Sequence, residues 1–281
     1  MTAKATRRLA RFPSLFLLVA TLVLSLIVIK LNTNLSSKAT RPSNPPNWGF
    51  AAKLDNGVQN IPISESPIYI QFQSDNFNPQ LGYTAEIMFK PSAAAFPSKF
   101  LFSYLSGGSD QPSLQLLVSS YSDNTSGYGM TLQSFINERT ETGTCQQNSI
   151  VIFTPSLTSE QITSWHHAAI AIQNDGQYTL FLDGKRSPQV LTLAGICPSS
   201  DPFVVGVGNG LVASFAGTLD EVRISNVARY TPDFPGITAP FGLDINTLAL
   251  YHFDKDYKDF AGKSGAGTPI GKIDFVRSRI K

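Results

Sequence analysis

Charge is scarce in this sequence. Asp, Glu, Lys and Arg make up 15% of its 281 residues, against about 25% in an average globular domain. The chain also holds 21 glycines and 18 prolines. This composition argues against coiled coils, helical bundles and solvated disorder, because these classes need abundant charge or few helix breakers.

Acidic residues are missing from residues 1–41, which contain seven of the 22 basic residues. The rest of the chain therefore carries 15 basic and all 20 acidic residues, a net charge of −5. The mildly basic character belongs to the N-terminus alone. Nucleic acid is accordingly not an expected partner of the body.

Residues 12–29, between Arg11 and Lys30, form a run of eighteen uncharged and mostly apolar residues. At about 1.5 Å per residue, a helix over this run approaches the ~30 Å hydrocarbon core of a bilayer. We predict a transmembrane signal anchor at residues 12–30 behind a basic cytoplasmic tail at residues 1–11. The alternative is a cleaved signal peptide, which usually has an apolar region of about 7–15 residues and a small-x-small site; no Ala-x-Ala follows closely here.

Residues 31–47 are rich in Pro, Ser and Asn and predict an extended linker. Residues 48–281 then form the body. Its two cysteines and lack of further long apolar runs suit export. We expect a single-pass protein of the cell membrane, with the N-terminus in the cytoplasm and the body outside it.

The body shows no sustained 3.6-residue apolar period. Short runs rich in Ile, Val, Phe, Tyr and Thr alternate with Gly, Pro, Asn and Asp, a pattern typical of strands and turns. With no helices to make parallel crossovers, we predict an all-β fold of two stacked antiparallel sheets. The predicted strands are residues 68–73, 84–90, 100–105, 114–119, 130–135, 149–154, 166–173, 177–182, 203–208, 217–224 and 248–253.

The clearest local unit is residues 166–186. Asn174-Asp175-Gly176 predicts a hairpin turn with positive-φ residues, and Asp183-Gly184 predicts the next turn. Period-2 alternation places Tyr178, Leu180 and Leu182 on one face, with Thr179 and Phe181 on the other. Residues 156–163 predict a single helical turn that leads into Trp165.

Four segments resemble the laminin-G/concanavalin A-like jelly-roll family. They are YTAEIMFKPS (residues 83–92), SWHHAAIAIQNDGQYTLFLDGKR (164–186), FAGTLDEVRISNVARYTPDF (215–234) and ITAPFGLDINTLALYHFD (237–254). The resemblance covers roughly residues 50–280 and implies a jelly-roll sandwich. It does not imply one function, because this superfamily includes lectins, glycosidases and adhesion modules.

Catalytic carboxylates are not apparent. Glycosidases of this fold present Glu-x-Asp-x-x-Glu or Glu-x-Asp-x-Glu on one strand face, and neither pattern occurs. The nearest acidic groups are Asp220-Glu221 and the loop that contains Asp254, Asp256 and Asp259. We therefore expect a protein that is not an enzyme, with no catalytic residues.

Several polar residues are expected to be structural. His166, His167 and His252 have no third metal ligand at nearby spacing and are interpreted as hydrogen-bonded core or rim histidines. Glu221 and Arg223 share a strand face, which favours a same-strand charge pair over a recognition patch. Cys145 and Cys197 are the only cysteines and predict one disulfide.

Calcium is the one cofactor that the resemblance suggests, because many relatives hold this ion with loop oxygens. Asp75, Asn76 and Asp123 are the candidate ligands, although they form no spaced signature. Tyr121, Tyr128 and Tyr230 are candidate sugar-stacking residues in loops.

The sequence thus predicts a membrane-anchored, extracytoplasmic, non-catalytic binding domain for a polysaccharide or a cell-surface protein. One alternative is an architectural envelope or adhesion domain without a small ligand. A glycosidase of the same fold is the remaining one.

Overall fold

The computed structural model describes residues 48–54, 68–72, 77, 79–94, 96–104, 114–122, 127–199, 202–211 and 213–278. The predicted cytoplasmic tail, anchor and linker lie outside these residues. The proposed calcium ligands Asp75, Asn76 and Asp123 also lie outside them. In the part of the chain that is described, no helix combines the length and hydrophobicity that a bilayer crossing requires.

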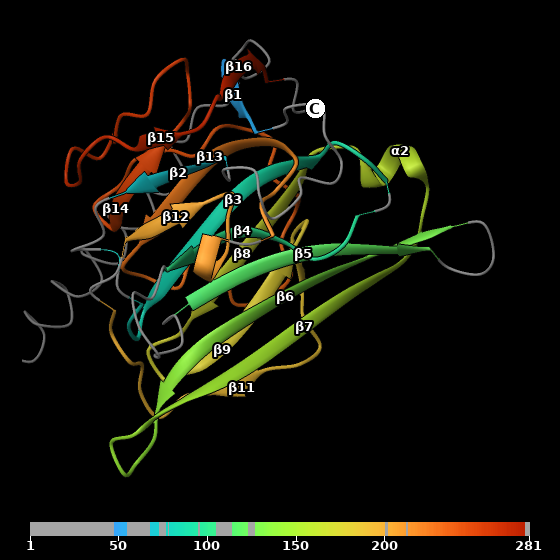
Figure 1. Cartoon of the computed structure of the whole chain (residues 1–281). Coiled ribbons are helices and arrows are strands. Elements are labelled where there is room, and N and C mark those ends of the chain that lie inside the picture. The colour runs from blue at the N-terminus through green and yellow to red at the C-terminus, as the bar shows by residue number, and fades with distance from the viewer. Residues whose placement is uncertain are drawn as a thin grey trace, which may run out of the picture. The chain divides into compact units, whose positions relative to one another are not determined.

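Two antiparallel sheets form the sandwich (Figure 1). The nine-stranded sheet has the order β10-β9-β8-β3-β13-β1-β16, with β11 paired to β9 and β14 paired to β13. Its strands are β1 (Phe50–Lys53), β3 (Tyr83–Pro91), β8 (His166–Ile172), β9 (Gln177–Leu182), β10 (Lys185–Arg186), β11 (Leu191–Thr192), β13 (Gly217–Ser225), β14 (Thr247–Tyr251) and β16 (Asp274–Arg277).

The seven-stranded sheet has the order β15-β2-β12-β4-β5-β6-β7. Its strands β5, β6 and β7 are long and curved (Figure 1). The members of this sheet are β2 (Tyr69–Phe72), β4 (Lys99–Tyr104), β5 (Leu114–Ser122), β6 (Tyr128–Arg139), β7 (Cys145–Leu157), β12 (Phe203–Val205) and β15 (Thr268–Ile270). Two short helices complete the described elements, α2 (Ser159–Ile162) and η1 (Asn209–Leu211).

The predicted all-β, two-sheet antiparallel sandwich is confirmed. Each of the eleven predicted strands coincides with an observed one, although β6 and β7 extend well beyond the predicted limits. Five short strands were not predicted: β1, β10, β11, β15 and β16. They have two to four residues each, too few for an alternating pattern to show.

The core fills the space between the sheets with aromatic side chains. Phe203 on β12 lies at its centre, with ring centroids 5.5 Å from Phe102 and 5.3 Å from Tyr104 on the neighbouring strand β4. Phe77 approaches the same ring edge-on at 5.7 Å. Each of these aromatic side chains is fully buried, and each such burial contributes about 2–3 kcal/mol.

The predicted hairpin over β8 and β9 is confirmed, with a refinement at its turn. Gln173 and Gln177 close the loop through a backbone hydrogen bond of 2.8 Å, and within Asn174-Asp175-Gly176 only Gly176 has positive φ. In the next turn both Asp183 (φ 50°) and Gly184 (φ 77°) are left-handed, as a two-residue hairpin with a primed turn requires.

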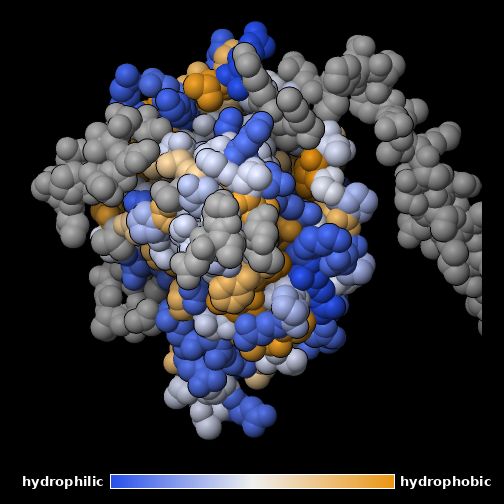
Figure 2. Space-filling view, turned by 90° about the vertical axis from the view of Figure 1, so that its right-hand side faces the viewer, coloured by the Kyte–Doolittle hydropathy of each residue, from blue (hydrophilic) through white to orange (hydrophobic). Residues whose placement is uncertain are grey.

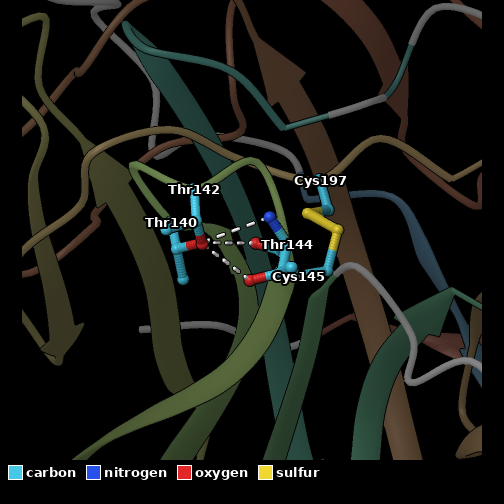
Figure 3. The surroundings of a disulfide bond; sticks show 5 residues. All are labelled: Thr140, Thr142, Thr144, Cys145 and Cys197. Atoms are coloured by element: carbon cyan, nitrogen blue, oxygen red, sulfur yellow. Dashed lines mark hydrogen bonds between the residues drawn. A yellow bond between two sulfur atoms is a disulfide. The ribbon is translucent and has the colours of Figure 1, made fainter.

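The predicted disulfide joins Cys145 to Cys197 (Figure 3). It ties the start of β7 to the segment that follows β11. Beside it, the hydroxyl of Thr140 lies 2.9 Å from that of Thr142 and 2.8 Å from that of Thr144. The bond therefore fixes one end of the long β6–β7 hairpin.

Candidate functional site

A cleft of about 650 Å³ lies on the outer face of the nine-stranded sheet. Its floor comes from β3 and β8, where Met88 pairs with His167. These two side chains point outward because their neighbours Ile87 and Ala168 face the core. Lys90 continues the outward row on β3, and Trp165 immediately precedes β8.

The helical turn α2 builds one wall. Thr158 caps it in a reciprocal capping box with Gln161, and Ile162 anchors it in the core. Glu160, Thr163 and Ser164 line the cleft from this wall. The Thr163 hydroxyl donates to the Ser159 carbonyl at 2.9 Å and the Ser164 hydroxyl to the Gln161 carbonyl at 2.6 Å. Their oxygen lone pairs therefore remain available as acceptors.

The opposite wall belongs to residues 226–246, which connect β13 to β14 and are called the covering segment below. Phe234 of this segment stacks on Tyr230 at 4.0 Å between ring centroids, and its backbone N–H donates to the Gly184 carbonyl at 2.9 Å. Gly236 and Ile237 then line the cleft. The covering segment thus packs its aromatic side chains on the sheet and lines one side of the cleft.

Asp183 also lines the cleft, and it connects the β9–β10 turn to strand β8. Its Oδ2 lies 2.7 Å from His166 Nδ1, and its Oδ1 accepts a 2.8 Å hydrogen bond from the His167 backbone N–H. The other ring nitrogen of His166 lies 3.0 Å from the Gln161 carbonyl oxygen. His166 therefore joins α2 to the β9–β10 turn, and the interpretation of His166 as a hydrogen-bonded core histidine is correct.

A buried carboxylate, Glu86, lies beside the floor, on the same outer face of β3 as Met88. Its Oε1 accepts a 2.7 Å hydrogen bond from Arg223 Nε, while Oε2 lies 3.0 Å from His167 Nε2 and 2.7 Å from the Tyr230 hydroxyl. Burial raises the pKa of Glu86, but the His167 hydrogen bond and the Arg223 charge outweigh it and lower the pKa to about 2. This network holds the His167 ring in place at the floor.

The remaining predicted histidine, His252, places Nδ1 2.7 Å from Glu221 Oε1. The expected Glu221–Arg223 pair is therefore wrong. Strand β13 has a bulge between Asp220 and Arg223, and Glu221 there has φ 51°. The bulge breaks the alternation on which that expectation rested, so Glu221 meets His252 and Arg223 meets Glu86.

The three predicted sugar-stacking tyrosines do not lie together, and two of them lie in strands and not in loops as expected. Tyr121 (42% exposed) and Tyr128 lie at the β5–β6 end of the seven-stranded sheet. Tyr230 lies on the covering segment, half-buried, with its hydroxyl bound to Glu86. The structure brings none of them into the cleft, and their role in ligand binding stays a prediction.

Trp165 lines the cleft, although the sequence pattern marks it only as part of the family resemblance. The sequence signal for Trp165 is its position two residues before the outward-facing His167 and just after a helical turn. Among the described residues, no group of three or more His, Cys, Asp or Glu side chains is arranged to hold a metal ion.

The charges in the cleft are sparse and mixed. Lys90 contributes one ammonium, and Glu160 and Asp183 contribute two carboxylates. Figure 2 shows the side of the molecule at the right of Figure 1, where hydrophilic and hydrophobic residues are intermixed. A half-buried indole ring bordered by hydroxyl, carboxylate and ammonium groups can stack on an apolar ring face and hydrogen-bond the ring's polar edge.

The chain belongs to the Concanavalin A-like lectin/glucanases superfamily, whose sequence profile matches residues 65–233. No curated protein sequence matches it. The membership confirms the resemblance over residues 65–233; the segment at 237–254 lies beyond the matched residues.

Solved structures show a distant likeness of fold. An HCR/D mutant has a TM-score of 0.39 at 10% identity, over 64% of this chain and 44% of that one. Domain 4 of AbnA, an extracellular arabinanase from Geobacillus stearothermophilus in complex with arabinotriose, has a TM-score of 0.32 at 16% identity, over 53% of this chain and 62% of that one. An alginate lyase from Pseudomonas aeruginosa has a TM-score of 0.30 at 17% identity, over 52% of this chain and 64% of that one. This chain thus spans less than two thirds of each of them.

Proposed function

We propose that the chain is a membrane-anchored, extracytoplasmic, non-catalytic domain that binds carbohydrate in the cleft on its nine-stranded sheet. The observation that carries this proposal is the placement of Trp165. Its indole ring is half-buried at the cleft floor, with Lys90 on the neighbouring strand and Glu160 on the wall. Sugar rings stack on such aromatic faces and bind nearby polar groups through their hydroxyls.

The absence of a catalytic role is supported by the way the carboxylates are used. Asp183 is bound to His166 and the His167 backbone. Asp259 accepts hydrogen bonds from the backbone N–H groups of Leu250, Ala261, Lys263 and Ser264. Of the two carboxylates that line the cleft, only Glu160 is therefore free, whereas a glycosidase needs a nucleophile and acid pair.

The cellular placement of the domain is supported by two features. Residues 12–29 are uncharged and long enough to span most of a bilayer. The Cys145–Cys197 disulfide is typical of proteins in oxidising compartments outside the cytoplasm.

The test is a glycan array probed with the full chain in a detergent that lacks a sugar headgroup. We expect saturable binding that Trp165→Ala abolishes. Trp48→Phe is the background for the fluorescence measurement, because it leaves Trp165 as the sole tryptophan and keeps an aromatic ring in the buried cluster with Met88 against which Trp165 packs. Ligand should then shift the Trp165 fluorescence and protect it from acrylamide. A folded protein that binds no glycan would instead support the architectural alternative.

A further inference from the structure

The charged side chains of the cleft differ in whether they already form hydrogen bonds or ion pairs within the protein. Asp183 has both carboxylate oxygens engaged, by His166 and by the His167 backbone. Lys90 and Glu160, by contrast, form no hydrogen bond or ion pair with any described residue through their charged groups. They lie on different elements, β3 and α2, and they border the same cleft as Trp165.

The balance of charge in the cleft is negative. Two carboxylates face one ammonium, and residues 42–281 together carry a net charge of −5. A ligand with a carboxylate of its own would have to approach both acidic groups, each of which repels it by about 1 kcal/mol at 4 Å in water. A ligand without negative charge avoids this repulsion.

We propose that the cleft selects non-acidic pyranose units and rejects their uronic acid counterparts. This inference rests on the proposed function. A pyranose ring stacked against Trp165 offers hydroxyl oxygens to the Lys90 ammonium and hydroxyl hydrogens to the Glu160 carboxylate. The single cation and the free carboxylate then act as one donor and one acceptor, instead of as a site for an anion.

The experiment compares one neutral oligosaccharide with its own oxidised form. The array's best neutral ligand is compared with the same oligosaccharide in which one C6 CH2OH group is replaced by a carboxylate, so that the ring hydroxyls are unchanged. Titration of the Trp48→Phe protein, followed by Trp165 fluorescence, should show affinity weakened about fivefold, because the attraction to Lys90 offsets one of the two repulsions of about 1 kcal/mol each. Equal or tighter binding of the uronate would overturn the inference.

Charge reversal in the cleft gives the second arm. Glu160→Lys should remove the preference, giving the uronate an affinity at least equal to that of the neutral form, and Glu160→Gln should give an intermediate result. Glu141→Lys makes the same charge change at the exposed tip of the β6–β7 hairpin and should leave the preference intact. If both charge reversals change the preference equally, the preference comes from the net charge of the whole protein, which would contradict a role for Glu160. Failure of the proposed function is distinct, because then no glycan of either kind binds.

Discussion

Glu86 on β3 and Arg223 on β13 form a buried ion pair, with Oε1 of Glu86 2.7 Å from Nε of Arg223, although 137 residues separate them in sequence. The guanidinium carbon of Arg223 also lies 4.4 Å from the centroid of the Phe241 ring. The other carboxylate oxygen binds Tyr230 and His167. One acidic side chain thereby fastens the covering segment to the sheet and orients the cleft floor.

Glu86→Gln should lower the free energy of unfolding at pH 7 by about 3–5 kcal/mol, the usual cost of removing one partner from a buried ion pair. The reason is that Arg223 would remain buried without its counter-charge. Urea unfolding, followed by circular dichroism, measures this difference. Glu160→Gln is the control, since Glu160 is exposed and unpaired, and its replacement should change stability little. Equal effects of both substitutions would show that the ion pair contributes nothing.

The same pair predicts an acid dependence. The pKa of Glu86 is lowered from 4.5 to about 2 in the folded protein, so the folded state keeps this carboxylate ionised at pH values where the unfolded state takes up a proton. Stability should therefore fall as the pH drops from 4.5 toward 2, by up to about 1.4 kcal/mol per pH unit. The stability difference between the wild type and Glu86→Gln should shrink over this range. A difference that stays constant would contradict the lowered pKa.

Asp220 predicts the opposite dependence. Burial and the adjacent Glu221 charge raise the pKa of Asp220 from 3.8 to about 9, so the folded protein keeps a proton that the unfolded chain releases. Between about pH 5 and 8, stability should fall as pH rises, by about 1.4 kcal/mol per unit from this group. The side chain of Asp220→Asn cannot ionise. The stability of this variant relative to the wild type should therefore rise by about 1.4 kcal/mol per pH unit over this range. Parallel stability profiles of the two proteins would refute the raised pKa.

Alternation and turn chemistry were enough to predict the strands and the hairpin from sequence. Tyr178, Leu180 and Leu182 face the core and Phe181 the outer face, as the period-2 pattern indicates. These features depend on neighbours in sequence. The disulfide is predicted by the two cysteines of the chain, an even number that suits an exported domain.

The cleft depends on relationships that a sequence pattern does not contain. Met88 meets His167 only because β3 pairs with β8 in one particular register. The covering segment has no strand or helix period, so its packing on the sheet leaves no periodic signal. The bulge at Glu221 likewise redirects Arg223 from its near neighbour to Glu86, and a bulge inside a regular alternating run is not visible beforehand.

Loss of the disulfide should weaken the whole domain. Cys145 and Cys197 are 52 residues apart, and a bond that closes such a loop contributes about 4 kcal/mol by the chain-entropy relation. The double substitution Cys145→Ser with Cys197→Ser should lower the denaturant midpoint accordingly. Dithiothreitol should lower the wild-type midpoint to that of the variant and leave the variant unchanged. A wild type that dithiothreitol does not affect under unfolding conditions would contradict the contribution.

Gly184 tests whether the covering segment supports the cleft. Its φ is 77°, and a Cβ there would collide with the carbonyl oxygen of Phe234, whose own N–H donates to Gly184. Gly184→Ala should therefore cost the roughly 1–2 kcal/mol of left-handed backbone strain and also push residues 234–237 away from the sheet. Because Ile237 lines the cleft, glycan affinity should fall together with stability.

The matched control is Gly143→Ala at the β6–β7 tip, where φ is 82° and a Cβ would meet no atom within 4 Å. It carries the backbone strain alone, so it should lose the same 1–2 kcal/mol and keep full glycan affinity. Calorimetry of both variants, with ligand titration followed by Trp165 fluorescence, separates the two effects. If Gly184→Ala proves no worse than Gly143→Ala in either measurement, the covering segment moves freely and the wall that it provides is not needed for binding.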